Sequence, residues 1–209
     1  ALGATVVRVT PGERYRRHAP DAYVIDPRCA EDYRRLLAEA NAMPQRIVHL
    51  WGVKPEKVLD DETSVQHCMD RGCHSLMYLT QAIADRHAED PISLLVVTSQ
   101  VHDVTGGETL CPEKATVLGL CRVIGAEIPS VTARNLDIEL PPEADRYPDH
   151  LLSELLDEAN TNDAEPLVAY RGRYRWVQTV EPLPLASPRD EALPLREGGV
   201  YLITGGLGG

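Results

Sequence analysis

The sequence has no phenylalanine, few lysines and no long apolar run. Its 21 basic residues include only Lys54, Lys57 and Lys114 as lysines, and they face 32 acidic residues, giving a formal net charge of -11. Because the arginines form no basic stripe, we expect neither a nucleic-acid partner nor an anionic membrane surface as a partner. No stretch reaches the ~18 apolar residues of a membrane span, and residues 1–4 do not resemble a targeting signal.

Cysteine usage excludes two further classes. The five cysteines are odd in number and none forms a Cys-x-x-Cys pair, so neither a disulfide framework nor a zinc ribbon is expected. The adjacent pairs His67-Cys68 and Cys73-His74 look like metal ligands, but on an α-helix Cys68 and Cys73 would point about 140° apart. We therefore expect buried structural cysteines, no metal site and a reduced, cytoplasmic location.

What remains is the alternation of strands and helices typical of an α/β domain. Strands are expected at residues 4–9, 22–26, 45–52, 92–98, 134–140, 167–170 and 174–180, the last two as a hairpin, and helices at about 30–42, 63–87, 112–127 and 149–160. This order predicts a doubly wound parallel sheet with right-handed crossovers. The helix at 112–127 is apolar on nearly all sides, so we expect a second packing surface on its outer face.

A change of composition near the end marks a second domain. Residues 181–199 are rich in proline, charged and small residues and are expected to form an extended linker. A new strand begins at about Val200 and runs into Gly205, Gly206, Leu207, Gly208 and Gly209. Glycines at such a turn let the backbone approach a pyrophosphate, so these five residues are candidate dinucleotide ligands, the alternative being an incidental glycine tail. Because no helix follows the turn, and Leu2-Gly3 reads as a helix end, we expect a piece of a longer polypeptide.

One further candidate site lies after the buried strand at 92–98. His102-Asp103 could form half of a catalytic dyad, although no nucleophile is placed near it in the sequence. The alternative is a solvated pair of loop residues.

Five segments carry a resemblance to a known family. They are residues 98–100 (TSQ), 111–127 (CPEKATVLGLCRVIGAE), 133–137 (ARNLD), 170–173 (YRGR) and 201–209 (YLITGGLGG). In order and spacing they resemble the ketoreductase of a modular polyketide synthase, specifically its N-terminal structural subdomain and the first strand of its catalytic subdomain. The resemblance implies a truncated Rossmann-like, short-chain-dehydrogenase-like α/β fold. It also implies a structural subdomain at 1–180, a linker at 181–199 and the start of an NADPH-binding subdomain at 200–209.

The resemblance also implies that the two halves have different roles. The catalytic half binds NADPH and carries the reductive residues, whereas the first half lacks a working cofactor site. Reduction in this family needs a tyrosine four residues before a lysine, the lysine lowering the pKa of the phenol. The three lysines here follow Leu50, Val53 and Leu110 at that spacing, so no catalytic residue is expected in this chain.

The sequence therefore predicts the structural half of an NADPH-dependent β-ketoacyl reductase. Implied partners are the catalytic half of the same polypeptide, an acyl carrier protein with a phosphopantetheine-bound substrate, and neighbouring synthase domains. The short linker implies that no enoylreductase is inserted between the halves. Two alternatives stay open: a pseudo-ketoreductase scaffold beside a dehydratase or methyltransferase, and a free-standing nucleotide-binding protein, which would need a helix after the glycine turn.

Overall fold

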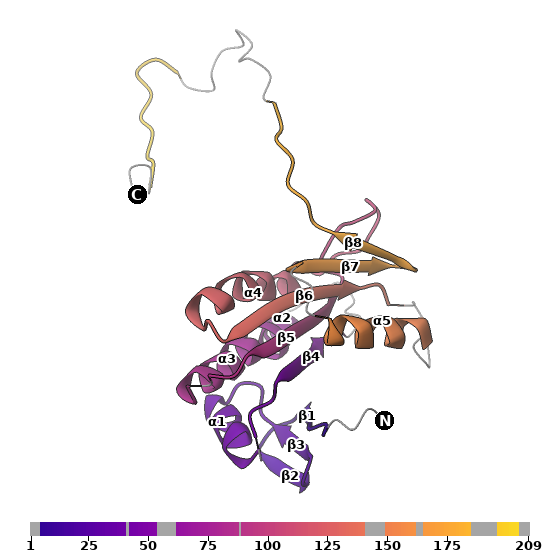
Figure 1. Ribbon diagram of the computed structural model, residues 1–209. Helices are drawn as coiled ribbons and strands as arrows, with labels where there is room; N and C mark the ends of the chain where they lie inside the picture. The colour runs from indigo at the N-terminus through magenta and orange to yellow at the C-terminus, as the bar shows by residue number, and fades with distance from the viewer. Residues whose placement is uncertain are drawn as a thin grey trace. The chain divides into compact units, whose positions relative to one another are not determined.

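The computed structural model describes residues 5–40, 42–53, 62–87, 89–140, 149–161, 165–184 and 196–204. The chain divides into two units, Ala1–Gln178 and Thr179–Gly209. The first unit holds every helix and strand that the structure describes (Figure 1).

A small lobe opens the first unit. Its sheet has the order β1-β3-β2 and is followed by α1; the elements are β1 (Arg8–Pro11), β2 (Arg16–Ala19), β3 (Ala22–Ile25) and α1 (Ala30–Glu39). The strand expected at 4–9 begins later, because its pairing with β3 starts only at Arg8 opposite Ala22. The sequence pattern missed β2, whose residues are mostly polar and which is held by antiparallel pairing with β3.

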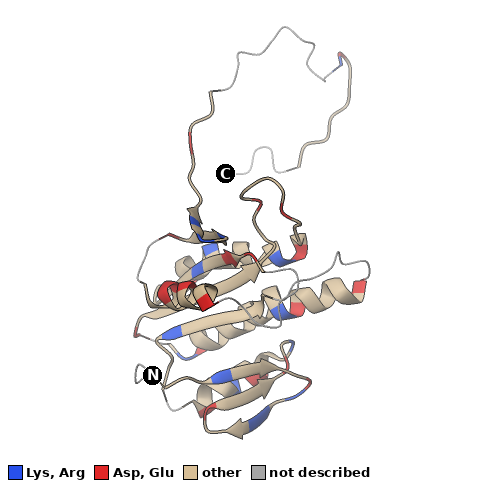
Figure 2. Cartoon of the chain, turned by 90° about the vertical axis from the view of Figure 1, so that its right-hand side faces the viewer, with Lys and Arg blue, Asp and Glu red and all other residues tan. Residues whose placement is uncertain are grey.

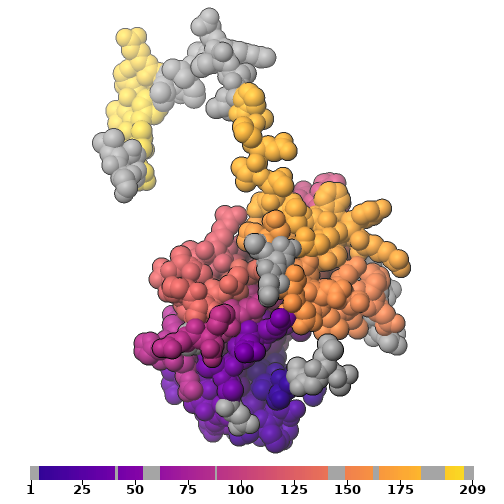
Figure 3. All heavy atoms as spheres, viewed as in Figure 1, coloured from indigo at the N-terminus to yellow at the C-terminus, as the bar shows by residue number. Residues whose placement is uncertain are grey.

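The lobe packs onto the main body through α1. The ring of Tyr33 of α1 packs at a tilt against Tyr78 of α3, with the ring centroids 6.1 Å apart, and Arg34 pairs with Asp85 at 2.9 Å. In the space-filling view, the purple atoms of the lobe meet the magenta atoms of α3 (Figure 3). The two sheets therefore share one hydrophobic core, which continues from Tyr23 and Ile25 into the helices of the main body.

The main sheet has the order β4-β5-β6-β7-β8. Its strands are β4 (Arg46–Gly52), β5 (Ile92–Ser99), β6 (Val131–Ile138), β7 (Leu167–Arg171) and β8 (Tyr174–Val177), parallel except for β8. The expected hairpin of β7 and β8 is present, and Gly172 supplies its positive φ of 57°. β6 starts before the expected Arg134 because Val131 already pairs with Ile92. The predicted α/β class with a mainly parallel sheet is confirmed.

Helices cover both faces of this sheet. The helices are α2 (Glu62–Met69), α3 (Ser75–Asp85), α4 (Thr116–Glu127) and α5 (Asp149–Asn160), with a 3-10 helix, η2, at Pro112–Ala115. Leu94 and Val96 of β5 pack with residues of α3 and α4, whereas Leu95 and Val97 pack with Leu151 of α5. This alternation is the period of two expected of a strand buried on both sides.

The position of α5 corrects the prediction of uniformly right-handed crossovers. Strands β4, β5, β6 and β7 follow one another across the sheet, and α5 covers the face opposite α3 and α4 (Figure 1). The β6-to-β7 crossover therefore has the opposite hand from the two before it, so the three cannot all be right-handed.

The long helix expected at 63–87 is interrupted. A π-helix, η1, at Asp70–His74 separates α2 from α3, and the Ser75 amide donates to the Asp70 carbonyl five residues earlier. A π-turn advances fewer degrees per residue than an α-turn. The angle of about 140° between Cys68 and Cys73 assumed a continuous α-helix, and that assumption is wrong.

Apolar side chains are exposed in both units. On α4, Val123 is 49% exposed and its neighbours Gly119 and Ala126 are also exposed, so this face of the helix is open. In the second unit, Val200, Leu202 and Ile203 are exposed and form no strand, which corrects the strand expected there. A strand needs a hydrogen-bonded neighbour, and the described part of the chain supplies none at these residues.

Candidate functional site

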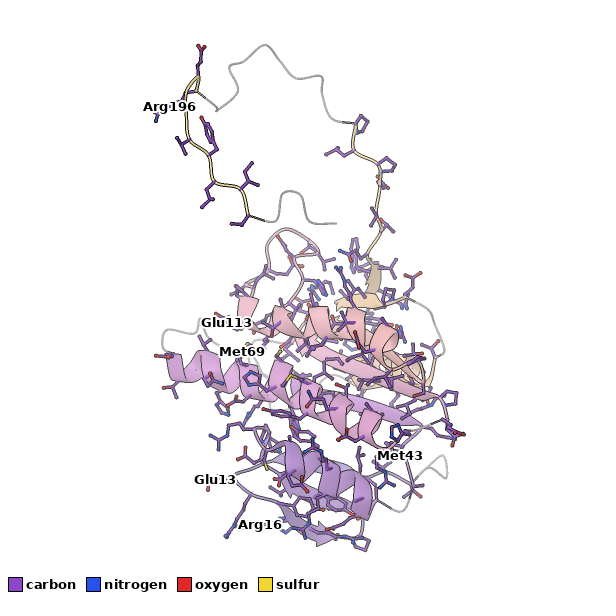
Figure 4. All side chains as sticks on the ribbon, turned by 90° about the vertical axis from the view of Figure 1, so that its left-hand side faces the viewer. Glu13, Arg16, Met43, Met69, Glu113 and Arg196 are labelled. Atoms are coloured by element: carbon purple, nitrogen blue, oxygen red, sulfur yellow. The ribbon has the colours of Figure 1, made fainter. Side chains whose placement is uncertain are left out.

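The carboxyl ends of β4 and β5 border a cavity of about 210 Å³. Gly52 ends β4 there and Thr98 lies at the end of β5, while α2, η1 and η2 supply His67, Arg71 and Lys114. α2 packs against η2 beside this cavity, and Figure 4 shows the labelled Met69 and Glu113 of these two helices on the same side of the ribbon. In open parallel sheets, ligands bind outside the carboxyl ends of the strands, so this cavity is the candidate site of the first unit.

Lys114 is the chemically most important residue of the cavity. It is only 4% exposed, and its Nζ donates to Ser99 Oγ at 3.2 Å. Leu110 stands four residues earlier, as the sequence shows, and is 41% exposed. No tyrosine is among the described residues that line the cavity. The lysine of the Tyr–Lys pair acts by lowering the pKa of the tyrosine phenol, which is the acid in reduction. Because no phenol lies beside Lys114 among the described lining residues, that acid is missing from this cavity.

A buried polar network shapes the loop that follows β5. Asp137 of β6 accepts hydrogen bonds from Thr98 Oγ1 at 2.9 Å and from the backbone amides of Val101 and His102 at 3.2 and 3.3 Å. Arg171 of β7 donates to Asp137 at 2.8 Å and to Glu108 at 3.0 Å. Glu108 in turn accepts from backbone amides of residues 104–107. The network therefore fixes the loop over the ends of β6 and β7.

His102 and Asp103 do not form a catalytic dyad. His102 Nε2 lies 3.1 Å from Asn135 Oδ1, and Asp103 accepts a hydrogen bond from the Gly106 amide at 3.0 Å. The two side chains thus serve separate local contacts. The dyad interpretation is wrong, because consecutive residues in this loop point to different partners.

Three of the five cysteines, Cys73, Cys111 and Cys121, are less acidic than an ordinary thiol. Burial is the main cause that raises the pKa of Cys73 and of Cys111, and it raises the pKa of Cys121 to about 12. A thiol with a raised pKa stays protonated at neutral pH and is a poor nucleophile and metal ligand. Within the described ranges, no group of three or more His, Cys, Asp or Glu side chains is placed to hold a metal ion.

The predicted dinucleotide ligands Gly205, Gly206, Leu207, Gly208 and Gly209 lie outside the described residues, so their role stays a prediction.

Among the helices that the structure describes, none is both long and apolar enough to cross a membrane. In the ribbon of Figure 2, acidic and basic residues are interspersed along the described parts of the chain.

Sequence reasoning missed the buried network of Asp137, Glu108 and Arg171. In the sequence, Asp137 and Arg171 stand out only as parts of the ARNLD and YRGR segments. A usable signal was present for two of them, since Asp137 lies in β6 and Arg171 in β7, where a buried charge needs a partner, whereas Glu108 lies in the loop after β5.

Comparison with known proteins places the chain in a family. The family model described as beta-ketoacyl synthase-like, N-terminal matches residues 2–158. The chain belongs to this family. A phenolphthiocerol/phthiocerol polyketide synthase of Mycobacterium tuberculosis is 28% identical over 148 residues, or 71% of this chain and 7% of that protein. Polyketide synthase ThaG of Burkholderia thailandensis is 26% identical over 86% of this chain and 3% of that protein. The chain thus spans less than a tenth of these synthases.

Solved structures give the fold of this beta-ketoacyl synthase-like family member. A structure of adenylation, ketoreductase and pseudo Asub domains from a keto acid-selecting NRPS module superposes with a TM-score of 0.77 at 22% identity, covering 88% of this chain and 15% of that one. An N-terminal ketoreductase from the macrolactin assembly line gives 0.66 at 20% identity, covering 84% and 35%. The predicted resemblance to a ketoreductase domain of a modular polyketide synthase, with a Rossmann-like fold, is confirmed.

Proposed function

We propose that the chain is the structural half of a polyketide synthase ketoreductase. In the parent synthase it would support a catalytic half that reduces the β-keto group of a polyketide on the phosphopantetheine arm of an acyl carrier protein. The observation that carries the proposal is the environment of the Lys114 side chain. It is buried against Ser99, with Leu110 where a dehydrogenase has its catalytic tyrosine. This half keeps the Rossmann-like fold and lacks the acid for reduction.

The same proposal divides the chain into a structural subdomain at 1–180, a linker at 181–199 and the start of the catalytic subdomain at 200–209. Gly205, Gly206, Leu207, Gly208 and Gly209 would contact a nicotinamide cofactor, NADPH in our proposal. A solved alcohol dehydrogenase from Thermococcus sibiricus, similar in fold at a TM-score of 0.53, is complexed with 5-hydroxy-NADP. The open face of α4 around Val123 would pack against the catalytic half. A cytoplasmic location fits the cysteine usage.

Calorimetry with NADPH tests the proposal on two proteins, this chain and a version extended by a complete catalytic half. Binding and β-keto reduction by the extended protein alone would support a structural half. Tight NADPH binding by the 209 residues would contradict it and favour an independent nucleotide-binding domain. Cofactor binding by neither protein would favour the second candidate, a pseudo-ketoreductase scaffold, for which the missing tyrosine is also the supporting observation.

A further inference from the structure

The cavity at the carboxyl ends of β4 and β5 is positively charged, although the chain as a whole is strongly acidic. Two cationic side chains, Arg71 and Lys114, line it, and none of its described lining residues is acidic. The chain as a whole carries 32 acidic and 21 basic residues. Chance placement of charges would therefore favour carboxylates here, so the cavity attracts anions against the overall charge.

The Arg71 guanidinium has no anionic partner among the described residues. Its Nε is buried and finds no hydrogen-bond acceptor in the described part of the chain, and no ion pair to the guanidinium is present there. The nearest acidic residue in sequence, Asp70, is engaged with Gln66 at 2.8 Å and with His74 at 2.9 Å. A buried donor without an acceptor is unfavourable, and an anionic ligand would supply the missing acceptor.

The backbone around Arg71 is unusual as well. Arg71 belongs to the π-helix η1, and Gly72, which follows it, also lines the cavity. Such π-turns concentrate at functional sites, because they redirect a side chain away from the regular helical stripe. A cavity of about 210 Å³ is smaller than the sites of drug-sized ligands, which fits a small anion or the anionic end of a longer molecule.

We propose that this cavity binds the phosphate group of a small phosphorylated molecule, with Arg71 and Lys114 as its recognition residues. A phosphate monoester carries a charge of about -1.5 to -2 at neutral pH, which matches two cations, and its oxygens accept from guanidinium and ammonium groups. The lining residues all belong to the first unit and none of them is a proposed cofactor ligand, so the proposal does not depend on the proposed reductase function.

The test is an anion titration of the full 209-residue chain at constant ionic strength. Inorganic phosphate, phosphopantetheine and AMP are the probes, with chloride as the reference anion. Calorimetry gives the affinity, and the Nε–Hε resonance of Arg71 reports contact by NMR. We expect saturable phosphate binding that shifts this resonance, and a loss of at least about tenfold in affinity in Arg71→Gln. A probe that binds more tightly than inorganic phosphate would identify the rest of the ligand.

Arg122→Gln, an exposed arginine on α4, is the matched control and should bind like the wild type. Thermal unfolding in chloride checks that both variants fold. If Arg71→Gln does not fold, the shift of the Arg71 Nε–Hε resonance in the wild type still shows whether phosphate contacts Arg71. Phosphate that acts no differently from chloride, or equal affinity in folded Arg71→Gln, would overturn the proposal.

Discussion

Arg171 and Asp137, which lie on adjacent strands of the sheet, form a buried ion pair. Arg171 Nη2 lies 2.8 Å from Asp137 Oδ2, and the two side chains are 7% and 0% exposed. The pair links the YRGR and ARNLD segments, 34 residues apart, and holds the loop after β5 through Glu108 and the His102 carbonyl. The ion pair therefore joins these two sequence segments in the folded structure.

Removing Arg171 should strongly destabilise the fold. In Arg171→Met the Asp137 carboxylate stays buried without its cation, which costs about 3–5 kcal/mol of the free energy of unfolding. Urea denaturation measures this loss. Arg173→Met, two residues away and exposed, is the control and should change stability by less than about 0.5 kcal/mol. Equal stability of the two variants would show that the ion pair contributes nothing to the fold.

His49 should make the fold sensitive to acid. Its ring is buried, with Nε2 2.8 Å from Ser75 Oγ, and burial lowers the pKa of His49 from 6.5 to about 4. Because the unfolded chain takes up the proton first, stability is complete above about pH 6.5 and falls as the pH drops toward 4. The shift corresponds to about 3 kcal/mol at most.

Urea denaturation at pH 7 and pH 4.5 checks this expectation. The difference in the free energy of unfolding between the two pH values should be smaller in His49→Gln than in the wild type. His150→Gln, an exposed histidine on α5, should keep the full difference. An unchanged pH dependence in His49→Gln would assign the acid sensitivity to other groups.

The sequence predicted elements best where the hydrophobic pattern is local. The helix at 149–160 has the expected bounds, and the run at 92–98 became β5 with one more residue. Elements set by pairing were missed or displaced: β2 depends on β3, and β6 begins where β5 pairs with it. The absence of a tyrosine before Lys114 could be read from spacing alone. The Arg171–Asp137 pair could not, because sequence order does not say which strand ends meet.

The open face of α4 should tolerate charge in this chain but not in the complete ketoreductase. Val123 is half exposed, so Val123→Asp should change the free energy of unfolding of the 209 residues by less than about 0.5 kcal/mol. If this face packs against the catalytic half, the same variant should weaken binding between the two halves expressed separately. Leu156→Asp on α5, which covers the opposite sheet face and is 63% exposed, is the matched control. Unchanged binding of Val123→Asp would place the interface elsewhere.

A second buried network, on the α5 face, should respond to pH in the same direction as His49. Glu158 is 5% exposed and accepts from Arg134 at 2.7 Å and from Arg175 at 2.6 Å. Burial acts to raise the pKa of Glu158, but the hydrogen bonds from the two arginines outweigh it and lower this pKa below its usual 4.5. The contribution of Glu158 is therefore complete above about pH 4.5 and is lost as the pH falls through the lowered value.

At pH 7, Glu158→Gln removes the only carboxylate that the described structure pairs with Arg134, leaving that buried guanidinium without an anion. We expect the free energy of unfolding to fall by about 3 kcal/mol or more, measured by urea denaturation. Asp157→Asn, one residue earlier and exposed, changes the same net charge and should have little effect. Similar losses in both variants would mean that net charge, and not the buried contact, sets the stability of this face.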